Sequence, residues 1–195
     1  MPGGVEPPVM SDGHGHGHEH GESGTHDHHG HDLDRVTAAV FTVSSSRTLT
    51  DDAAGDAVQS AFEGAGHTVG TREVVDDDFE NVRSAVESAV ADESIDVVVT
   101  TGGTGVTPDD VTVEATAILF DKELAGFGEL FRTLSREEVG TRVVGTRAVA
   151  GIVQRPEGED GVPVFCLPGS ENAARLGSEE IVVPEASHLA GLARR

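Results

Sequence analysis

The chain has 195 residues, a formal net charge of −22 and one lysine, Lys122. An acidic surface repels nucleic acid and anionic lipid, so we expect neither as a partner. No run of about 18 apolar residues is present, so we expect no membrane span. The N-terminus lacks an apolar signal core and the lone Cys166 can form no internal disulfide, which favours a cytoplasmic protein.

The acidic excess also indicates the salt concentration in which the protein works. Asp and Glu number 35 against 13 Lys and Arg. Acidic, lysine-poor chains are typical of cytoplasms that hold molar salt, where screening is nearly complete beyond about 3 Å. We therefore interpret the charge as adaptation to a halophile's interior, and expect the fold to loosen when salt is removed.

Residues 1–34 are rich in Gly, His, Asp and Glu and poor in apolar groups. This composition predicts a disordered tail, with one domain at residues 35–195. Most of the ten histidines lie between His14 and His31 and could bind Zn²⁺, Ni²⁺ or Cu²⁺. Their irregular spacing favours opportunistic binding over a fixed structural site.

The first half of the domain alternates short apolar runs with helical repeats. The expected elements are a strand at 36–43, a helix at 54–62, a strand at 67–75, a helix at 79–90 and a strand from 97. This order predicts a parallel sheet covered on both faces. Right-handed crossovers bring the carboxyl ends of the strands to one edge, where ligands bind in open α/β sheets.

The second half adds a helical apolar face at 127–134 and a strand pair at 148–167 around the turn cluster 155–161. We expect this pair to form a hairpin near the sheet edge. A helix begins near Glu171, and residues 184–193 are a short helix or a frayed end. The fold class is therefore α/β, with a mostly parallel sheet.

The most informative stretch is the glycine-rich turn that follows the strand of Val97–Val99. Amides of such a turn attract anions, phosphate above all. Thr107–Asp110 supplies helix-start chemistry, and Asp109 and Asp110 suit a hard cation such as Mg²⁺. The run Asp76–Asp78 follows the neighbouring strand. The alternatives are helix capping for Asp109 and Asp110 and ordinary acidic surface for Asp76–Asp78.

Positive charge is rare in this chain and therefore informative. Arg47 ends the polar loop Ser44–Arg47, which follows the first strand. Arg47, Arg132, Arg142 and Arg147 could each receive a phosphate group or pair with a surface carboxylate.

Several separated motifs resemble the MoaB/MogA family of molybdenum-cofactor biosynthesis proteins. They are Thr-Thr-Gly-Gly-Thr-Gly at 100–105, Asp-Val-Thr-x-Glu-Ala at 110–115, Glu-Leu-x-Gly-Phe-Gly-Glu at 123–129, Arg-x-Leu-Ser at 132–135, Arg-Ala-x-Ala-Gly at 147–151 and Leu-Pro-Gly-Ser at 167–170. The resemblance covers roughly residues 36–190. It implies a three-layer α/β/α fold and a homotrimer, or a hexamer as in some archaeal relatives.

The resemblance also implies an activity, the adenylylation of molybdopterin by Mg-ATP with release of pyrophosphate, and a downstream molybdate-insertion protein as partner. The two functional aspartates of the family map onto Asp77 and Asp110, which would serve catalysis and bind Mg²⁺. The residues implied in phosphate binding are Thr101, Gly102, Gly103, Thr104 and Gly105. Those implied in pterin binding are Ser44, Arg47, Pro168, Gly169 and Ser170.

The chain departs from the family in two places. Asp109 stands where the family usually carries Arg, and the acidic loop lacks the usual Pro, so Asp76, Asp77 and Asp78 all remain candidates for the first aspartate. The segment 106–110 is similar to CinA-type relatives. The alternative functions are therefore a CinA-like nucleotide pyrophosphate enzyme, or a non-enzymatic pterin- or metal-binding protein that works through its histidine tail.

Overall fold

A computed structural model of the protein describes residues 32–156, 158 and 160–195. Six strands form one sheet in the order β2-β1-β3-β6-β5-β4. The strands are β1 (Thr37–Val43), β2 (Thr68–Val75), β3 (Val97–Thr101), β4 (Lys122–Glu123), β5 (Val149–Gln154) and β6 (Gly161–Leu167). The neighbours among β2, β1, β3 and β6 run parallel, whereas β5 pairs antiparallel with β6 and with β4.

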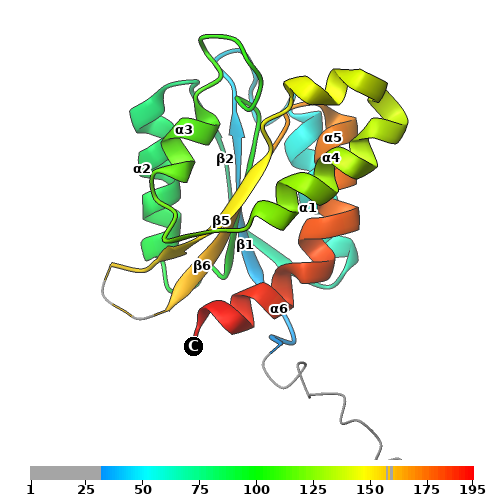
Figure 1. Ribbon diagram of the computed structural model, residues 1–195. Helices are drawn as coiled ribbons and strands as arrows, with labels where there is room; N and C mark the ends of the chain where they lie inside the picture. The colour runs from blue at the N-terminus through cyan, green and yellow to red at the C-terminus, as the bar shows by residue number, and fades with distance from the viewer. Residues whose placement is uncertain (1–31, 157, 159) are drawn as a thin grey trace, which may run out of the picture.

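Helices cover both faces of this sheet (Figure 1). The α-helices are α1 (Ala53–Gly64), α2 (Phe79–Ala91), α3 (Thr112–Ala117), α4 (Ala125–Val139), α5 (Glu171–Gly177) and α6 (Val183–Ala193). A 3₁₀ segment, η2 (Gly140–Gly145), follows α4, and a π-helical segment, η3 (Ser178–Val182), joins α5 to α6. The predicted α/β fold with a hairpin beside a parallel sheet is confirmed.

Each face of the sheet has its own hydrophobic core. On one face, α1, α4, α5 and α6 bury side chains such as Phe62, Phe131 and Ala186 against the sheet. On the other face, α2 packs Val86 and Val90 against it. All seven residues of β6 are buried, as a strand covered on both faces requires.

Local hydrogen bonds decide where the helices begin. Asp52 caps α1 by accepting from the Gly55 amide, and Asp78 caps α2 by accepting from the Glu80 and Asn81 amides. A helix follows Thr107–Asp110, as predicted, but α3 begins only at Thr112 and no side chain of the described residues caps it. The Asp110 carboxylate instead binds within its own loop.

The described chain begins at Asp32, which pairs with His188 of α6. The Leu33 amide donates to the Ser187 carbonyl at 3.2 Å, which ties this end of the chain to α6. The predictions for the histidine tail fall on residues 1–31 and lie outside the described residues. Within the described part of the chain, no helix is both long and apolar enough to cross a membrane.

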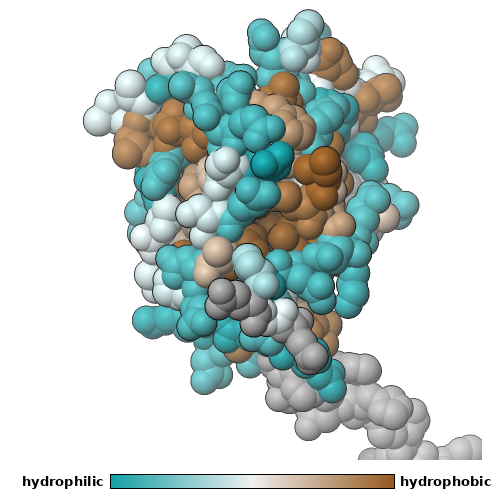
Figure 2. Space-filling model, turned by 90° about the vertical axis from the view of Figure 1, so that its left-hand side faces the viewer, coloured by the Kyte–Doolittle hydropathy of each residue, from teal (hydrophilic) through white to brown (hydrophobic). Residues whose placement is uncertain are grey.

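Figure 2 shows the side of the molecule that α2 and α3 cover, where hydrophobic patches interrupt a mostly hydrophilic surface. Two large apolar side chains lie exposed next to α3. Ile118 follows the helix directly and is 68% exposed, and Val106, in the loop before it, is 76% exposed.

Candidate functional site

Three loops meet at the carboxyl edge of the parallel strands, above the centre of the sheet (Figure 1). They follow β1, β3 and β6, which are direct neighbours, so their ends lie side by side. Together with η2 they border an open cavity of about 660 Å³. Its lining residues are Val43, Ser44, Ser46, Arg47, Gly102, Gly103, Thr104, Gly105, Asp110, Arg142, Gly145, Thr146, Pro168, Gly169 and Ser170.

Direct contacts hold these loops in place. The Gly102 amide donates to the Leu167 carbonyl at 3.0 Å, and the Thr101 hydroxyl donates to the Pro168 carbonyl at 2.9 Å. Gly169 packs so closely that a Cβ on it would lie 2.9 Å from the Gly102 Cα. Arg47 reaches across from the first loop and donates to the Gly169 carbonyl at 3.0 Å. Hydrogen bonds and close packing therefore join the three loops at the floor of the cavity.

Three carbonyl groups of the glycine loop, residues 102–105, accept hydrogen bonds from residues that do not line the cavity. The Gly103 carbonyl accepts from the Thr112 amide at 3.0 Å and the Thr104 carbonyl accepts from the Arg147 amide at 3.1 Å. The Gly105 carbonyl accepts from Arg147 Nε at 2.6 Å. The Gly103 carbonyl belongs to the same peptide group as the Thr104 amide, so its bond to Thr112 leaves the Thr104 amide on the opposite side.

Two neighbouring amides of the glycine loop have no hydrogen-bond acceptor among the described residues. Neither the Gly103 amide nor the Thr104 amide donates a hydrogen bond to any residue that the structure describes. Thr104 is only 3% exposed, and a buried backbone donor without a partner is rare. Adjacent unpaired amides in a cavity wall form an anion-binding nest.

Asp110 lies in the cavity wall and accepts hydrogen bonds from the loop that carries it. Its Oδ2 atom accepts from the Thr107 amide and the Thr107 hydroxyl, both at 2.7 Å. Burial alone would raise the pKa of Asp110, but these bonds, the Gly105 amide and the charge of Arg147 lower it overall. The carboxylate is therefore ionised, and it shapes the glycine loop.

Asp77 lies outside the cavity lining, next to the first loop. Its Oδ2 atom accepts from the Ser45 amide at 2.8 Å, and its own amide donates to the Ser45 hydroxyl at 3.2 Å. Asp78 caps α2, and Asp76 is exposed. The structure thus brings Asp110 to the cavity, whereas the Asp77 carboxylate supports the Ser44–Arg47 loop.

The four arginines noted in the sequence have different surroundings. Arg47 and Arg142 line the cavity, and the Arg142 guanidinium has no hydrogen bond or ion pair with any described residue. Arg147 lies outside the cavity lining, donates to the Gly105 carbonyl of the glycine loop and pairs with Glu114. Arg132 lines a separate depression between α4 and β5. In a chain of charge −22, two arginines facing one cavity favour an anionic ligand.

Sequence reasoning did not identify Thr146 and Gly145, which lie beside Arg142 at the end of η2. The Thr146 hydroxyl is buried and has no partner among the described residues. The only signal for this wall is its position directly before the Arg-Ala-x-Ala-Gly motif. A 3₁₀ segment has too few residues to show a hydrophobic period.

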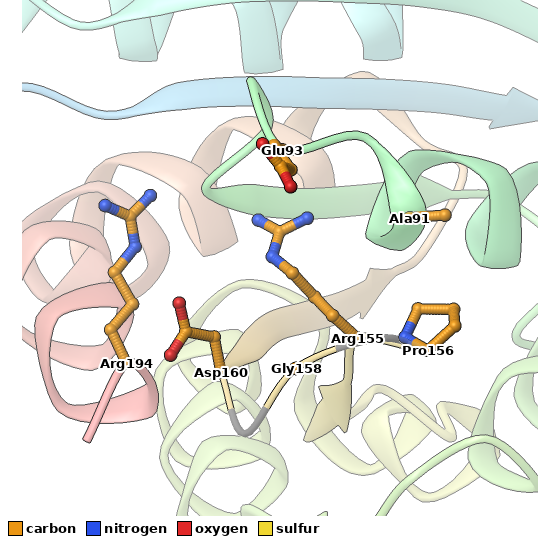
Figure 3. A pocket seen from close by; sticks show the side chains of 7 residues that line it. All are labelled: Ala91, Glu93, Arg155, Pro156, Gly158, Asp160 and Arg194. Carbon is orange, nitrogen blue, oxygen red and sulfur yellow. The ribbon is translucent and has the colours of Figure 1, made fainter.

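A second cavity, of about 590 Å³, lies at the opposite edge of the sheet, beside the turn between β5 and β6. Figure 3 shows the Arg155 side chain running from this turn toward Glu93. Its guanidinium donates to the carbonyls of Val90, Asp92 and Ile95, so Arg155 serves to close the end of α2. Arg194, which also lines the cavity, pairs with Asp96. These cations already have partners and are not free for a ligand.

No group of three or more His, Cys, Asp or Glu side chains that could hold a metal is found among residues 32–156, 158 and 160–195. Mg²⁺ needs no such cage, since it usually keeps several waters and binds through one or two carboxylates and substrate phosphates. The Asp110 carboxylate in the cavity wall fits an ion that arrives with a nucleotide. The site can therefore bind a phosphate-bearing ligand between amides, arginines and one carboxylate.

Comparison with known proteins shows the same fold and similar sequences. Residues 39–188 match the family described as "Probable molybdopterin binding domain". Molybdenum cofactor biosynthesis protein B of Bacillus cereus is 40% identical over 155 residues, which cover 79% of this chain and 88% of that protein.

Two solved structures are also similar. A crystal structure of a molybdenum cofactor biosynthesis protein B aligns with a TM-score of 0.74 and 39% identity, over 80% of this chain and 94% of that one. The tungsten cofactor synthesizing protein MoaB from Pyrococcus furiosus aligns with a TM-score of 0.70 and 38% identity, over 84% and 99%.

Proposed function

The chain belongs to the family of probable molybdopterin-binding domains and has a role in molybdenum cofactor biosynthesis, and from this premise we propose that it adenylylates molybdopterin. The substrates are Mg-ATP and molybdopterin, and the products are adenylyl-molybdopterin and pyrophosphate. A phosphate oxygen of the pterin attacks the α-phosphorus of ATP. The bond from that phosphorus to the oxygen bridging to the β-phosphate breaks, and pyrophosphate leaves.

The observation that carries this proposal is the pair of unpaired amides at Gly103 and Thr104. They line a cavity of about 660 Å³, which falls within the volume range of pockets for small-molecule ligands. A phosphate group accepts hydrogen bonds in the geometry that such a nest offers. The same wall of loops carries Arg47 and Arg142, whose charges complement a triphosphate or the phosphate of a pterin.

The residues present suit the needs of phosphoryl-type transfer, which depends on alignment and neutralisation of charge more than on covalent chemistry. The Gly103 and Thr104 amides would orient the phosphate chain. Arg47 and Arg142 would neutralise its charge, and Arg47 is already fixed by its bond to Gly169. Asp110 would hold the magnesium that accompanies ATP.

The proposal also includes the residue roles and the oligomeric state that the family resemblance implies. Ser44, Arg47, Pro168, Gly169 and Ser170 belong to the two loops on either side of the glycine loop and would bind the pterin. Asp77 would act through the Ser44–Arg47 loop that it holds, and would reach the metal only if that loop moves. A cytoplasmic homotrimer or hexamer, in which exposed apolar residues such as Ile118 become buried, belongs to the same proposal.

The deciding experiment is incubation of the full chain with ATP, Mg²⁺ and molybdopterin in molar salt, with products separated by chromatography. Adenylyl-pterin and pyrophosphate in equal amounts are expected. Turnover of ADP-ribose or a pyridine nucleotide without pterin would replace the proposal with a CinA-like activity. Tight binding of pterin or metal with no turnover would indicate a binding protein instead.

Two neighbouring aspartates provide a matched pair of variants. Asp110→Asn should slow adenylylation at least about 100-fold, the cost that a small misplacement of reacting groups can reach. Asp109→Asn should stay within about twofold, because Asp109 is exposed and forms no hydrogen bond with the described residues, and exposed substitutions have small effects. Equal activity of the two variants would refute the role of Asp110.

A further inference from the structure

We propose that Arg147 is a positioning residue that fixes the glycine loop in its anion-binding form without contacting the anion. The effect of Arg147 on catalysis rests on the proposed function. The loop geometry on which it depends can be measured independently of any reaction.

Arg147 donates most of the hydrogen bonds that the loop carbonyls accept. Its amide donates to the Thr104 carbonyl at 3.1 Å and its Nε donates to the Gly105 carbonyl at 2.6 Å. Its Nη2 donates to the Asp110 carbonyl at 2.8 Å. One residue thus holds three carbonyl groups at both ends of the loop that carries Asp110.

The remaining guanidinium nitrogen fixes the arginine itself. Arg147 Nη1 pairs with the Glu114 carboxylate of α3, and the two side chains are 32% and 53% exposed. Arg147 directly precedes the buried Ala148, so its backbone is anchored at the start of β5. The loop is therefore fastened to two elements that do not line the cavity.

The position of the side chain argues against direct phosphate binding. Arg147 is absent from the lining of the 660 Å³ cavity and lies instead along a depression behind the loop, with Phe79 and Val111. Its three guanidinium nitrogens already have protein acceptors. Arg142 faces the cavity and remains available for the anion.

Arginine is required at this position by geometry. The planar guanidinium presents its donors in a fixed fork, which matches two carbonyls and one carboxylate at the same time. A lysine at position 147 would keep the charge but could not hold Gly105, Asp110 and Glu114 in these directions. Charge alone is therefore insufficient, and this separates a positioning role from an electrostatic one.

The test compares Arg147→Ala, Arg147→Lys and Glu114→Gln in the full chain. Binding of Mg-ATP is measured by calorimetry, and far-ultraviolet circular dichroism checks the fold. Both Arg147 variants should weaken binding about 10–100-fold, since a lost hydrogen bond to a charged group costs about that factor. Glu114→Gln should change it less than about threefold, since exposed ion pairs contribute little.

Two further measurements separate positioning from a general loss of stability. Guanidinium ion at tens of millimolar should restore at least tenfold of the lost affinity in Arg147→Ala and none in Arg147→Lys, where the lysine fills the space. The amide resonances of Gly103 and Thr104 should shift in the ¹⁵N spectrum of both Arg147 variants, because the loss of the side-chain bonds to the Gly105 and Asp110 carbonyls loosens the loop next to them.

The outcomes distinguish this inference from the proposed function. Arg147→Ala that binds Mg-ATP within twofold of the natural protein, or an Arg147→Lys variant with unchanged Gly103 and Thr104 resonances, would overturn it. If the natural protein binds no nucleotide, the proposed function fails. The ¹⁵N spectra then still decide whether Arg147 sets the loop.

Discussion

Replacement of Gly102 by alanine tests whether the floor of the cavity depends on a backbone conformation that only glycine adopts freely. Gly102 has φ +102°, and a Cβ on it would lie 2.4 Å from the Val43 carbonyl oxygen. That oxygen belongs to the backbone and cannot turn aside as a side chain would. Gly66 is a matched control, because it has φ +85° but no atom of the described residues lies within 4 Å of the place that its Cβ would take.

The two variants share one cost and differ in another. Positive φ costs a residue with a side chain about 1–2 kcal/mol, and the stiffer unfolded chain returns about 0.4–1 kcal/mol. Gly66→Ala should therefore destabilise the fold by at most about 1.6 kcal/mol. Gly102→Ala must also move the Val43 carbonyl, and overpacking of this kind adds about 1–3 kcal/mol.

The assay is urea unfolding followed by circular dichroism, because the chain has no Trp or Tyr for fluorescence. Since Val43 and Gly102 both line the cavity, Gly102→Ala should also weaken Mg-ATP binding, whereas Gly66→Ala should leave it unchanged. Equal losses of stability in the two variants would refute the reasoning, because they would show that the contact with Val43 contributes nothing.

Three further predictions concern charge. Asp52→Asn should lower the free energy of unfolding by about 3 kcal/mol, because it breaks a buried ion pair with Arg72. Asp56→Asn removes the other partner of that arginine, which is 63% exposed, and should lower it by at most about 1 kcal/mol. Urea titration measures both. Burial raises the pKa of Asp52, but hydrogen bonds from Gly55, Arg72 and Thr42 lower it below its ordinary 3.8. The ionised Asp52 therefore stabilises the fold fully above pH 3.8, and this stabilisation is lost as the pH falls through the lower pKa of the folded state. In Asp52→Asn, the free energy of unfolding should fall less steeply over that acid range. With a net charge of −22, the midpoint of unfolding should rise with potassium chloride, and a salt-independent midpoint would contradict adaptation to high salt.

The sequence predicts the fold well where a run of residues is compatible with only one kind of element. The valines at 97–99 have few alternatives to a buried strand, and β3 lies at the centre of the sheet. The start of α3 is less predictable, because Asp110 can cap a helix or bind its own loop, and two bonds from Thr107 favour the loop. The π-helical turn at Ser178–Val182 has no signal in the pattern of residues.

The candidate site is partly predictable for a topological reason. Parallel neighbours end at the same edge, so the loops that carry Ser44, Gly102 and Gly169 had to meet. The role of a single charged side chain does not follow from that rule. From charge alone, Arg142 and Arg147 could each bind a phosphate or pair with a carboxylate. Only the contacts show that the Arg147 side chain is occupied by carbonyls while Arg142 lines the cavity.

The central position of β6 has a consequence for how the protein assembles during folding. The bond between Thr101 and Pro168 joins residues 67 positions apart in the chain, and β6 enters the sheet only after β5 has been made. Closing so long a segment costs conformational entropy before any contact compensates it. The loop of Pro168–Ser170, which completes the cavity, therefore follows the last strand to be synthesised. A nascent chain that ends before residue 161 would hold the glycine turn without that loop, and the cavity would be incomplete.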